Sequence, residues 1–209
     1  MKKMIFAGCL IAGASVFAQA GETDSLKVVN LQEVQVVSTR ATSKTPVAFT
    51  NVSKEELKKQ NFGQDIPYLL SMTPSALTTS DAGAGIGYTT LRVRGTDGTR
   101  INITANGIPM NDAESHTLFW VNMPDFASSV KDIQVQRGAG TSTNGAGAFG
   151  ASVNMQTEGI SMKPYAELNA SYGTFNAHKE TVKFGTGLLN DHWAFDARLS
   201  NIGTDGYID

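Results

Sequence analysis

Six consecutive residues of this chain match the pattern of a loop that can hold a phosphate group. Gly145-Ala-Gly-Ala-Phe-Gly150 is a G-x-G-x-x-G sequence, which in dinucleotide-binding proteins lies between a strand and the N-terminus of a helix. Here a second strand-like segment, Ser152 to Thr157, follows the glycines, and no acidic residue stands about twenty positions further on within a strand-helix-strand unit. The sequence therefore favours a turn between two strands over the loop of a nucleotide-dependent enzyme.

A second candidate for chemistry is the pair Glu114 and His116, whose side chains could contact one metal ion. The other histidines, His178 and His192, are far away in the sequence, and no known spacing of metal ligands is satisfied. We interpret the pair as part of a polar loop and expect no metal site and no cofactor. The chain also has no Ser/His/Asp or Cys/His arrangement typical of nucleophilic catalysis, so we do not expect an enzyme.

The N-terminus predicts the compartment. Lys2-Lys3 is a short basic region, residues 4–17 are mostly apolar, and Ala18-Gln-Ala20 is typical of a cleavage site. We therefore expect residues 1–20 to be a secretory signal peptide. Cys9, the only cysteine, lies inside it, so the mature chain would have neither disulfides nor thiolate metal sites.

The composition narrows the choice of partners. The net charge of the 209-residue chain is −2, which argues against a nucleic-acid-binding protein that works through phosphate contacts. No apolar stretch after residue 20 approaches the length of a membrane-spanning helix. If the protein enters a membrane, it does so with β-strands or through a partner.

The elements that would position the glycine-rich run form a small α/β unit. Val130 to Arg137 and Ser152 to Thr157 have a roughly alternating pattern that predicts strands on either side of the run. Ser53 followed by Glu56 is a capping box, which predicts a helix through Gln60. We also expect strands at 46–52, 91–94 and 101–104 and a second helix at 65–72, with Asp65 as candidate N-cap. The connections between these elements include an Asn-Gly turn at 106–107, a long exposed loop at 109–119 and a helical turn at 124–129.

The pattern changes after Glu158. Residues 165–172, 181–188 and 193–200 alternate apolar and polar side chains, with turn residues at 173–176 and 190–191. Segments of about ten residues with this alternation are the signature of transmembrane β-barrel strands. A soluble antiparallel sheet shows the same alternation, so the pattern leaves both interpretations open.

A β-prone island lies in the polar leader. Glu33-Val-Gln-Val-Val-Ser-Thr39 is surrounded by mostly polar residues. It could be an edge strand of the domain's own sheet. It could also add as a strand to another protein, because main-chain pairing gives affinity without a fixed pocket.

The order of these segments resembles the N-terminal part of a TonB-dependent outer-membrane receptor, and the resemblance covers essentially the whole chain. Glu33 to Thr39 matches the TonB box, and Asn144 to Gly150 with Val153 to Thr157 matches the closing plug motif. Three fragments between them match successive plug signatures: Leu91-Arg-Val-Arg-Gly95, Asn106-Gly-Ile-Pro109 and Ile133-Gln-Val-Gln-Arg-Gly138. Asn106, Gln134 and Ala139 depart from the family, which often has Asp, Glu and Pro at these positions.

The resemblance implies a fold and a division of the chain. The fold is an α/β plug domain with a small mixed sheet and short helices, followed by the first antiparallel strands of a 22-stranded transmembrane β-barrel whose lumen the plug fills. We expect a signal peptide at 1–20 and a flexible leader with the TonB box at 21–43. The plug would follow at 44–158 and the start of the barrel at 159–209. Three strand-like segments cannot close a barrel, so we expect the chain to be a fragment or truncated product of a longer receptor.

The resemblance also implies roles for residues. The TonB box consists of Glu33, Val34, Gln35, Val36, Val37, Ser38 and Thr39. We expect Arg92, Arg94 and Arg137 to pair with carboxylates on the barrel wall, since unpaired charges there are costly, although solvated charges on a strand face are the alternative. The other plug-motif residues are Gly95, Gly138, Gly145, Gly147 and Gly150. We expect loops 78–89 and 110–122 to face the substrate, through Ser80, Asp81, Tyr88, Asn111, Asp112, Glu114, His116, Phe119 and Trp120.

The implied function is active transport of a scarce nutrient across the outer membrane of a Gram-negative cell. The implied partners are a TonB-type energy-transducing protein, outer-membrane lipid and a small-molecule chelate, with no nucleic acid. The short stretch ahead of the TonB box favours a receptor for a ferric siderophore, haem or cobalamin, with an oligosaccharide or peptide as alternative substrates. The rival from another class is a secreted soluble binding or adhesion module.

Overall fold

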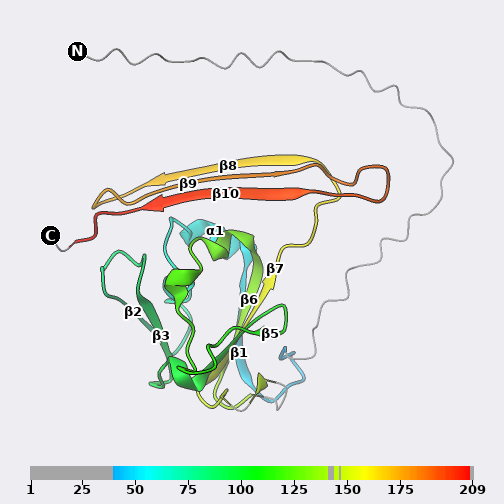
Figure 1. Cartoon of the computed structure of the whole chain (residues 1–209). Coiled ribbons are helices and arrows are strands. Elements are labelled where there is room, and N and C mark those ends of the chain that lie inside the picture. Colours follow the sequence, from blue (N-terminus) through cyan, green and yellow to red (C-terminus); the bar gives the residue numbers. More distant parts are fainter. Residues whose placement is uncertain (1–39, 141–143, 146, 208–209) are drawn as a thin grey trace, which may run out of the picture. The chain divides into compact units, whose positions relative to one another are not determined.

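The computed structural model describes residues 40–140, 144–145 and 147–207 (Figure 1). The predicted signal peptide and the predicted TonB box at 33–39 lie outside the described residues. Within the described part of the chain, no helix is long and apolar enough to cross a membrane.

A five-stranded mixed sheet forms the centre of the first part of the chain. Its strand order is β1-β6-β7-β4-β5. β4 pairs with β7 in parallel, and the other neighbours are antiparallel. The strands are β1 (Ala48–Ser53), β4 (Ile101–Ala105), β5 (Ile108–Pro109), β6 (Val130–Arg137) and β7 (Ala151–Thr157). The expected strands at 46–52, 101–104, 130–137 and 152–157 are confirmed within one or two residues.

The two central strands are buried on both faces. Ile133 and Val135 on β6, like Val153 on β7, are at most 1% exposed and belong to one apolar core that includes Leu57 and Leu70. The polar residues that alternate with them are buried too, among them Gln134, Gln136, Ser152 and Asn154. Both faces of these strands are therefore buried. The alternation in the sequence distinguishes an apolar face from a polar face, and neither face meets solvent.

The helices are short and cover this sheet. α1 (Lys54–Gln60) begins with the predicted capping box, in which the Ser53 hydroxyl accepts from the Glu56 amide and the Glu56 carboxylate accepts from the Ser53 amide. α2 (Ile66–Leu69) is shorter than the expected 65–72, because Pro74 and the turn before it end the helical run. The 3-10 helices are η1 (Gly98–Arg100), η2 (Trp120–Asn122) and η3 (Phe126–Ser129).

Asp65 corrects one detail of the sequence interpretation. It occupies the N-cap of α2 but makes no side-chain hydrogen bond to that helix. Its buried carboxylate instead accepts a hydrogen bond of 2.8 Å from the Thr89 hydroxyl. Burial raises the pKa of Asp65 to about 6, and the hydrogen bonds from Thr89 and from the Gly87 amide only partly oppose that rise.

Two hairpins extend the domain. β2 (Ala76–Ser80) pairs antiparallel with β3 (Thr89–Val93), so the expected loop 78–89 is confined to residues 81–88. The Asn106-Gly107 turn is confirmed: both residues have positive φ and join β4 to β5.

A separate three-stranded antiparallel sheet ends the chain, in the order β10-β9-β8. β8 (Tyr165–Tyr172) matches the prediction, whereas β9 (His178–Gly185) and β10 (Asp196–Gly203) correct the expected bounds 181–188 and 193–200 by three residues each. β9 starts early because the turn after β8 is tight, with Phe175 and Asn176 at positive φ. β10 starts late because Leu189 and Trp193 bridge each other inside the preceding turn.

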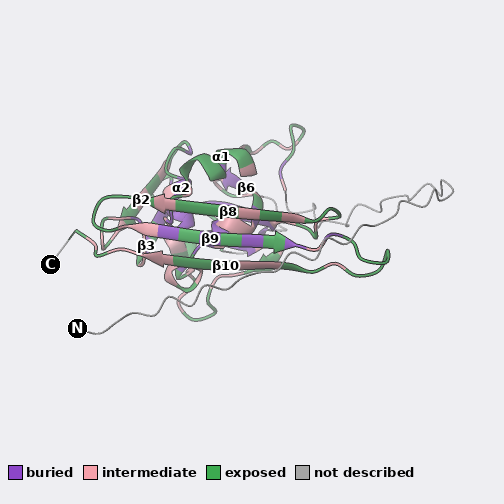
Figure 2. Cartoon of the chain, turned by 90° about the horizontal axis from the view of Figure 1, so that it is seen from above, coloured by how far each residue is buried: buried purple, intermediate pink, exposed green. Residues whose placement is uncertain are grey.

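This second sheet has the reverse polarity of a soluble sheet. Lys179, Thr181 and Lys183 on β9 are buried, whereas Val182 and Phe184, which alternate with Thr181 and Lys183, are exposed. Buried and exposed positions alternate along β9 (Figure 2). The exposed face continues on the neighbouring strands through Leu168, Tyr172 and Leu199. Polar side chains inside and apolar side chains outside are the arrangement of a membrane β-strand that lines a polar lumen.

Candidate functional site

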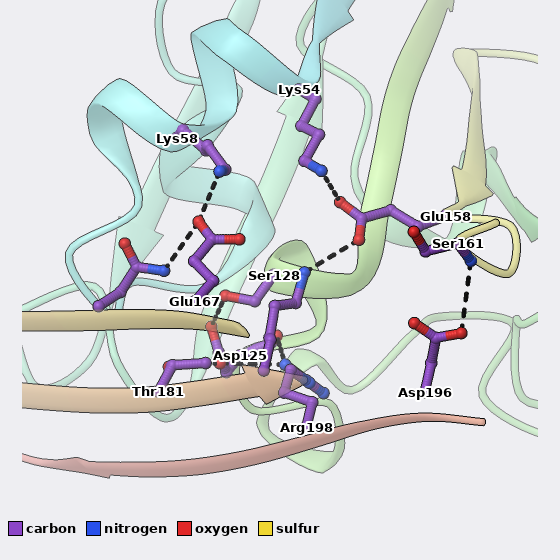
Figure 3. A network of polar contacts seen from close by, with 12 residues as sticks. Lys54, Lys58, Asp125, Ser128, Glu158, Ser161, Glu167, Thr181, Asp196 and Arg198 are labelled. Atoms are coloured by element: carbon purple, nitrogen blue, oxygen red, sulfur yellow. Dashed lines mark hydrogen bonds and ion pairs between the residues drawn. The ribbon is translucent and has the colours of Figure 1, made fainter. Parts of the chain in front are cut away.

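Asp125 is the centre of a buried polar cluster that joins the first part of the chain to the second sheet. It lies at the N-cap of η3 in the left-handed conformation, with φ 52°. Its carboxylate pairs with Lys179 Nζ on β9 at 2.7 Å. It also pairs with Arg198 Nη1 on β10 at 3.0 Å (Figure 3). The carboxylate also accepts from the hydroxyls of Thr181, Ser200 and Ser128. One side chain of the helical turn therefore holds two strands.

The ammonium group of Lys179 is fully satisfied. Besides Asp125, it donates to Asn61 Oδ1 at 2.8 Å and to Ser128 Oγ at 3.0 Å. These three acceptors match the three donors of an ammonium group. A buried cation is tolerated when it is paired and hydrogen-bonded in this way.

Burial and hydrogen bonding act in opposite directions on Asp125. Burial alone would raise the pKa of its carboxyl, but the hydrogen bonds from Lys179, Ser128 and Ser200 together outweigh it, and the pKa lies below its ordinary value. Asp125 therefore stays ionised at neutral pH. Removing the carboxylate would leave two cations without their partner, which is the costly way to break a buried ion pair.

Glu158, just after β7, makes a second link of the same kind. Its carboxylate pairs with Lys54 Nζ of α1 at 2.6 Å and with Lys183 Nζ of β9 at 3.0 Å. Burial opposes ionisation, but the two lysines prevail and hold the pKa of Glu158 below its ordinary value. A third, more exposed pair joins Lys58 of α1 to Glu167 of β8 at 2.5 Å. Three carboxylates and five cations thus connect α1, η3 and the second sheet.

These links surround a cleft of about 150 Å³. Its lining includes Lys58, Ser128, Glu167, Lys179 and Lys183. Apolar residues, among them Leu57 and Val130 of the core, line the cleft beside these charged groups.

The plug-motif residues from distant parts of the sequence are brought together at the other end of the central sheet. Gly138 has φ 90°, and a Cβ there would meet the guanidinium of Arg94. A Cβ at Gly150 would meet Thr96 and the Arg100 carbonyl, and the Gly138 amide donates to the Gly150 carbonyl at 2.7 Å. Because these two glycines have no side chain, the turn that follows β3 can pack directly against them. The matching fragments of the sequence therefore form one packed unit.

The remaining motif glycines have more space around them. Gly145 has φ 83° and is exposed, Gly147 has no atom within 4 Å of a built Cβ, and Gly95 has φ 79° with open space around it. After the run the chain enters β7 at Ala151, which pairs antiparallel with β6. The helix that a dinucleotide-binding loop requires is replaced by a strand, so the nucleotide interpretation has no structural basis.

The three arginines occupy different environments. Arg92 is exposed on β3, and Arg94 is exposed with φ 53°. Arg137 is half-buried and donates to the Thr50 hydroxyl at 2.5 Å. Within the described residues none of the three makes an ion pair with a carboxylate, and their pairing with a barrel wall stays a prediction.

Four of the predicted substrate-facing residues lie in one pocket of about 240 Å³. Asp81 and Tyr88 come from the loop between β2 and β3, whereas Phe119 is the N-cap of η2 and Trp120 is its first residue. Trp120 is buried, whereas Tyr88 and Phe119 are 64% and 46% exposed and form an aromatic surface. We call this space, which Arg92 also lines, the aromatic pocket.

The other predicted substrate-facing residues mainly build the loops. The Ser80 hydroxyl accepts from the Gly85 amide, and the Asp112 carboxylate accepts from the Glu114 and Ser115 amides. The Asn111 side chain bonds the backbone of Ile101, Ile103 and His116. Glu114 and His116 are exposed, and the described residues contain no group of three or more His, Cys, Asp or Glu side chains that could hold a metal ion.

Sequence reasoning missed the residues of the buried links, namely Asp125, Glu158, Lys179, Lys183 and Arg198. Lys183 and Arg198 carried a signal, because each stands between two apolar residues of a strand and buried charges need partners. Nothing in the sequence around Asp125 marks it as that partner.

Comparison with known proteins agrees with this geometry. Residues 41–152 match the model of the TonB-dependent receptor plug domain. The chain belongs to this family. A search of curated proteins finds no match.

Solved structures of similar fold include three outer-membrane receptors. The pyoverdine receptor of Pseudomonas aeruginosa has a TM-score of 0.61 at 17% identity, over 79% of this chain and 23% of that one. The ferric yersiniabactin uptake receptor of Yersinia pestis has a TM-score of 0.57 at 15% identity, over 74% and 24%. The alcaligin receptor of Bordetella pertussis has a TM-score of 0.57 at 19% identity, over 75% and 27%. The chain spans about a quarter of the length of each.

Proposed function

We propose that this chain is the plug and the first barrel strands of an outer-membrane receptor that takes up a scarce nutrient by TonB-dependent active transport. One observation carries the proposal: a plug domain is followed in the same chain by strands with polar inner and apolar outer faces, and Asp125 ties the two together. A soluble binding module has no use for an exposed face of Leu168, Val182 and Leu199.

The nutrient in this proposal is a metal chelate, such as a ferric siderophore, haem or cobalamin. The named neighbours are receptors for pyoverdine, yersiniabactin and alcaligin, which supports a chelate over an oligosaccharide or peptide. The aromatic pocket is the proposed contact, because Tyr88 and Phe119 offer flat apolar surfaces beside polar groups.

Energy would enter through residues 33–39. In this proposal they pair by strand addition with a TonB-type protein, and the resulting pull moves the plug. The links at Asp125 and Glu158 hold the plug to the wall until that pull arrives. The expected location is the Gram-negative outer membrane, with the plug in the barrel lumen.

Fractionation and uptake test the proposal. The intact receptor should be recovered in the outer membrane, and cells should accumulate one labelled chelate only when the energy-transducing complex is present. Recovery in the soluble periplasm would support the secreted binding module instead.

A panel of individual chelates identifies the substrate. Tyr88→Ala and Phe119→Ala should weaken binding of the transported chelate, whereas Phe149→Ala should not, because Phe149 is an exposed aromatic residue that does not line the pocket. Equal effects of the three substitutions would exclude the aromatic pocket as the contact.

A further inference from the structure

The first two residues that the structure describes are held by buried side chains of the central sheet. Ala41 is 5% exposed, and its amide donates to Gln134 Oε1 at 2.7 Å. Gln134 Nε2 returns a hydrogen bond to the Ala41 carbonyl at 3.0 Å. Arg40 pairs with Asp132 and donates to the Asn154 carbonyl at 3.1 Å. Both residues are therefore fastened to β6 and β7 by side chains, without being part of a strand.

Only a primary amide can make the contacts of Gln134. Its nitrogen donates to the Ala41 carbonyl and to Asn51 Oδ1, and its oxygen accepts from the Ala41 amide and from Gln136 Nε2. A carboxylate has no hydrogen to donate. Glutamate at this position would lose both donated bonds and would bury a charge beside the Ala41 carbonyl. The glutamine that stands where the family often has glutamate thus has a definite structural role here.

The position of these contacts determines where a pull would act. From Ala41 the chain turns back and enters β1 at Ala48, which pairs with Arg137 at the end of β6. β1 then runs along β6 until Asn51 lies opposite Gln134. A pull on the segment before Arg40 therefore reaches the contacts of Arg40 and Ala41 before it reaches any pair between β1 and β6. Without those contacts, the pull would act on Ala48 and could peel β1 from its end, one pair after another.

We propose that Arg40, Ala41, Asp132 and Gln134 form a latch through which a pull on the preceding segment enters the plug, and that the latch sets the load at which the plug begins to open. The latch residues position the force and contact no substrate. The inference rests on the proposed function for the origin of the pull, a TonB-type protein bound to residues 33–39.

Single-molecule pulling on the intact receptor in a lipid bilayer tests the latch. The handle is fused ahead of residue 33, and the rate of the first opening event is measured at fixed load. Gln134→Glu and Arg40→Ala should each raise this rate about tenfold or more, as expected for the loss of buried or charge-assisted hydrogen bonds. Lys44→Ala is the matched control, because Lys44 is exposed, lies just beyond the latch and should leave the rate unchanged.

A charge exchange separates the latch from a general effect on folding. Arg40→Asp combined with Asp132→Arg should restore most of the resistance that either single change removes. If Gln134→Glu fails to assemble, Arg40→Ala and the exchanged pair still decide the question. Unchanged opening rates in the assembled variants, or no recovery in the exchanged pair, would overturn the latch.

The outcome is independent of the proposed function, because the instrument supplies the pull. Fast opening in the latch variants together with uptake that does not need the transducing complex would retain the latch and reject TonB dependence. TonB-dependent uptake with unchanged opening rates in the latch variants would retain TonB dependence and reject the latch.

Discussion

The two sheets of this chain use the same alternating sequence pattern in opposite ways. In the central sheet, the apolar residues of β6 and β7, such as Ile133 and Val153, face a protein core. In the second sheet, Leu168, Val182 and Leu199 occupy one register row and face outward. The comparison teaches that alternation specifies a strand, whereas the surroundings of the strand decide which face is buried.

The two sheets meet where their polar faces can satisfy each other. Lys179 and Lys183 of β9 point toward the plug and find Asp125 and Glu158. The contact between the sheets therefore depends on ion pairs that surround a cleft of about 150 Å³.

The largest expected effect is the loss of Asp125. Asp125→Ala should weaken the attachment of the plug by about 3–5 kcal/mol, because Lys179 and Arg198 lose their common partner. Hydrogen exchange on the intact receptor should show faster exchange in η3 and in β9. Asp112→Ala, which removes an exposed carboxylate that bonds only its own loop, is the control, and equal exchange in the two variants would contradict the account.

The outward face of the second sheet gives the next effect. Leu168→Arg should cost about 2–4 kcal/mol, because it places a cation on the lipid-facing side of a membrane strand, whereas Tyr172→Arg at the end of the same strand should cost about 0–1 kcal/mol. The measurement is the unfolding free energy of the receptor in lipid. Equal costs at the two positions would mean that this face does not meet the bilayer.

Asp65 tests the interior of the plug through pH. Its pKa is about 6 in the folded protein against an ordinary value of 3.8, so the folded state binds the proton more tightly than the unfolded state. The stability that Asp65 contributes is complete below about pH 4 and is lost as the pH rises to about 6. Asp65→Asn keeps an acceptor for the Thr89 hydroxyl, and should stabilise the plug by about 1–2 kcal/mol at pH 8 and have little effect at pH 4. Thermal unfolding at both pH values checks this, and a gain that does not depend on pH would contradict it.

The smallest effect is expected at the capping box. Ser53→Ala removes the hydroxyl that accepts from the Glu56 amide and should cost about 0.5–1 kcal/mol. Hydrogen exchange of the α1 amides reports the loss locally. Ser71→Ala, at an exposed serine without a capping role, should leave these amides unchanged, and the same result for Ser53→Ala would show that packing alone holds α1.

The sequence predicted those parts of the fold that depend on neighbouring residues. The capping box at Ser53, the Asn106-Gly107 turn and β8 were predictable because each depends on local backbone chemistry or on a regular period. The start of β9 was not, because His178, Lys179 and Glu180 are all polar and show no alternation ahead of Thr181. The continuous burial of β7 was likewise hidden, since it depends on what covers the polar face.

The candidate site was predictable only in part. Tyr88 and Phe119 were expected on substrate-facing loops, and the structure brings them into one pocket, but their contact with a ligand stays a prediction. Asp125 was missed because a single aspartate carries no pattern. Gln134 appeared only as a departure from the family, and its role emerged once its contacts with Ala41 were known.

In the proposed function, a pull on the leader of this chain drives uptake through the plug. The most direct measurement compares surface binding with accumulation of the transported chelate in cells that carry Val36→Pro. Proline removes a main-chain donor from the predicted TonB box and blocks strand addition. The account predicts unchanged binding and a loss of accumulation, whereas unchanged accumulation would contradict it.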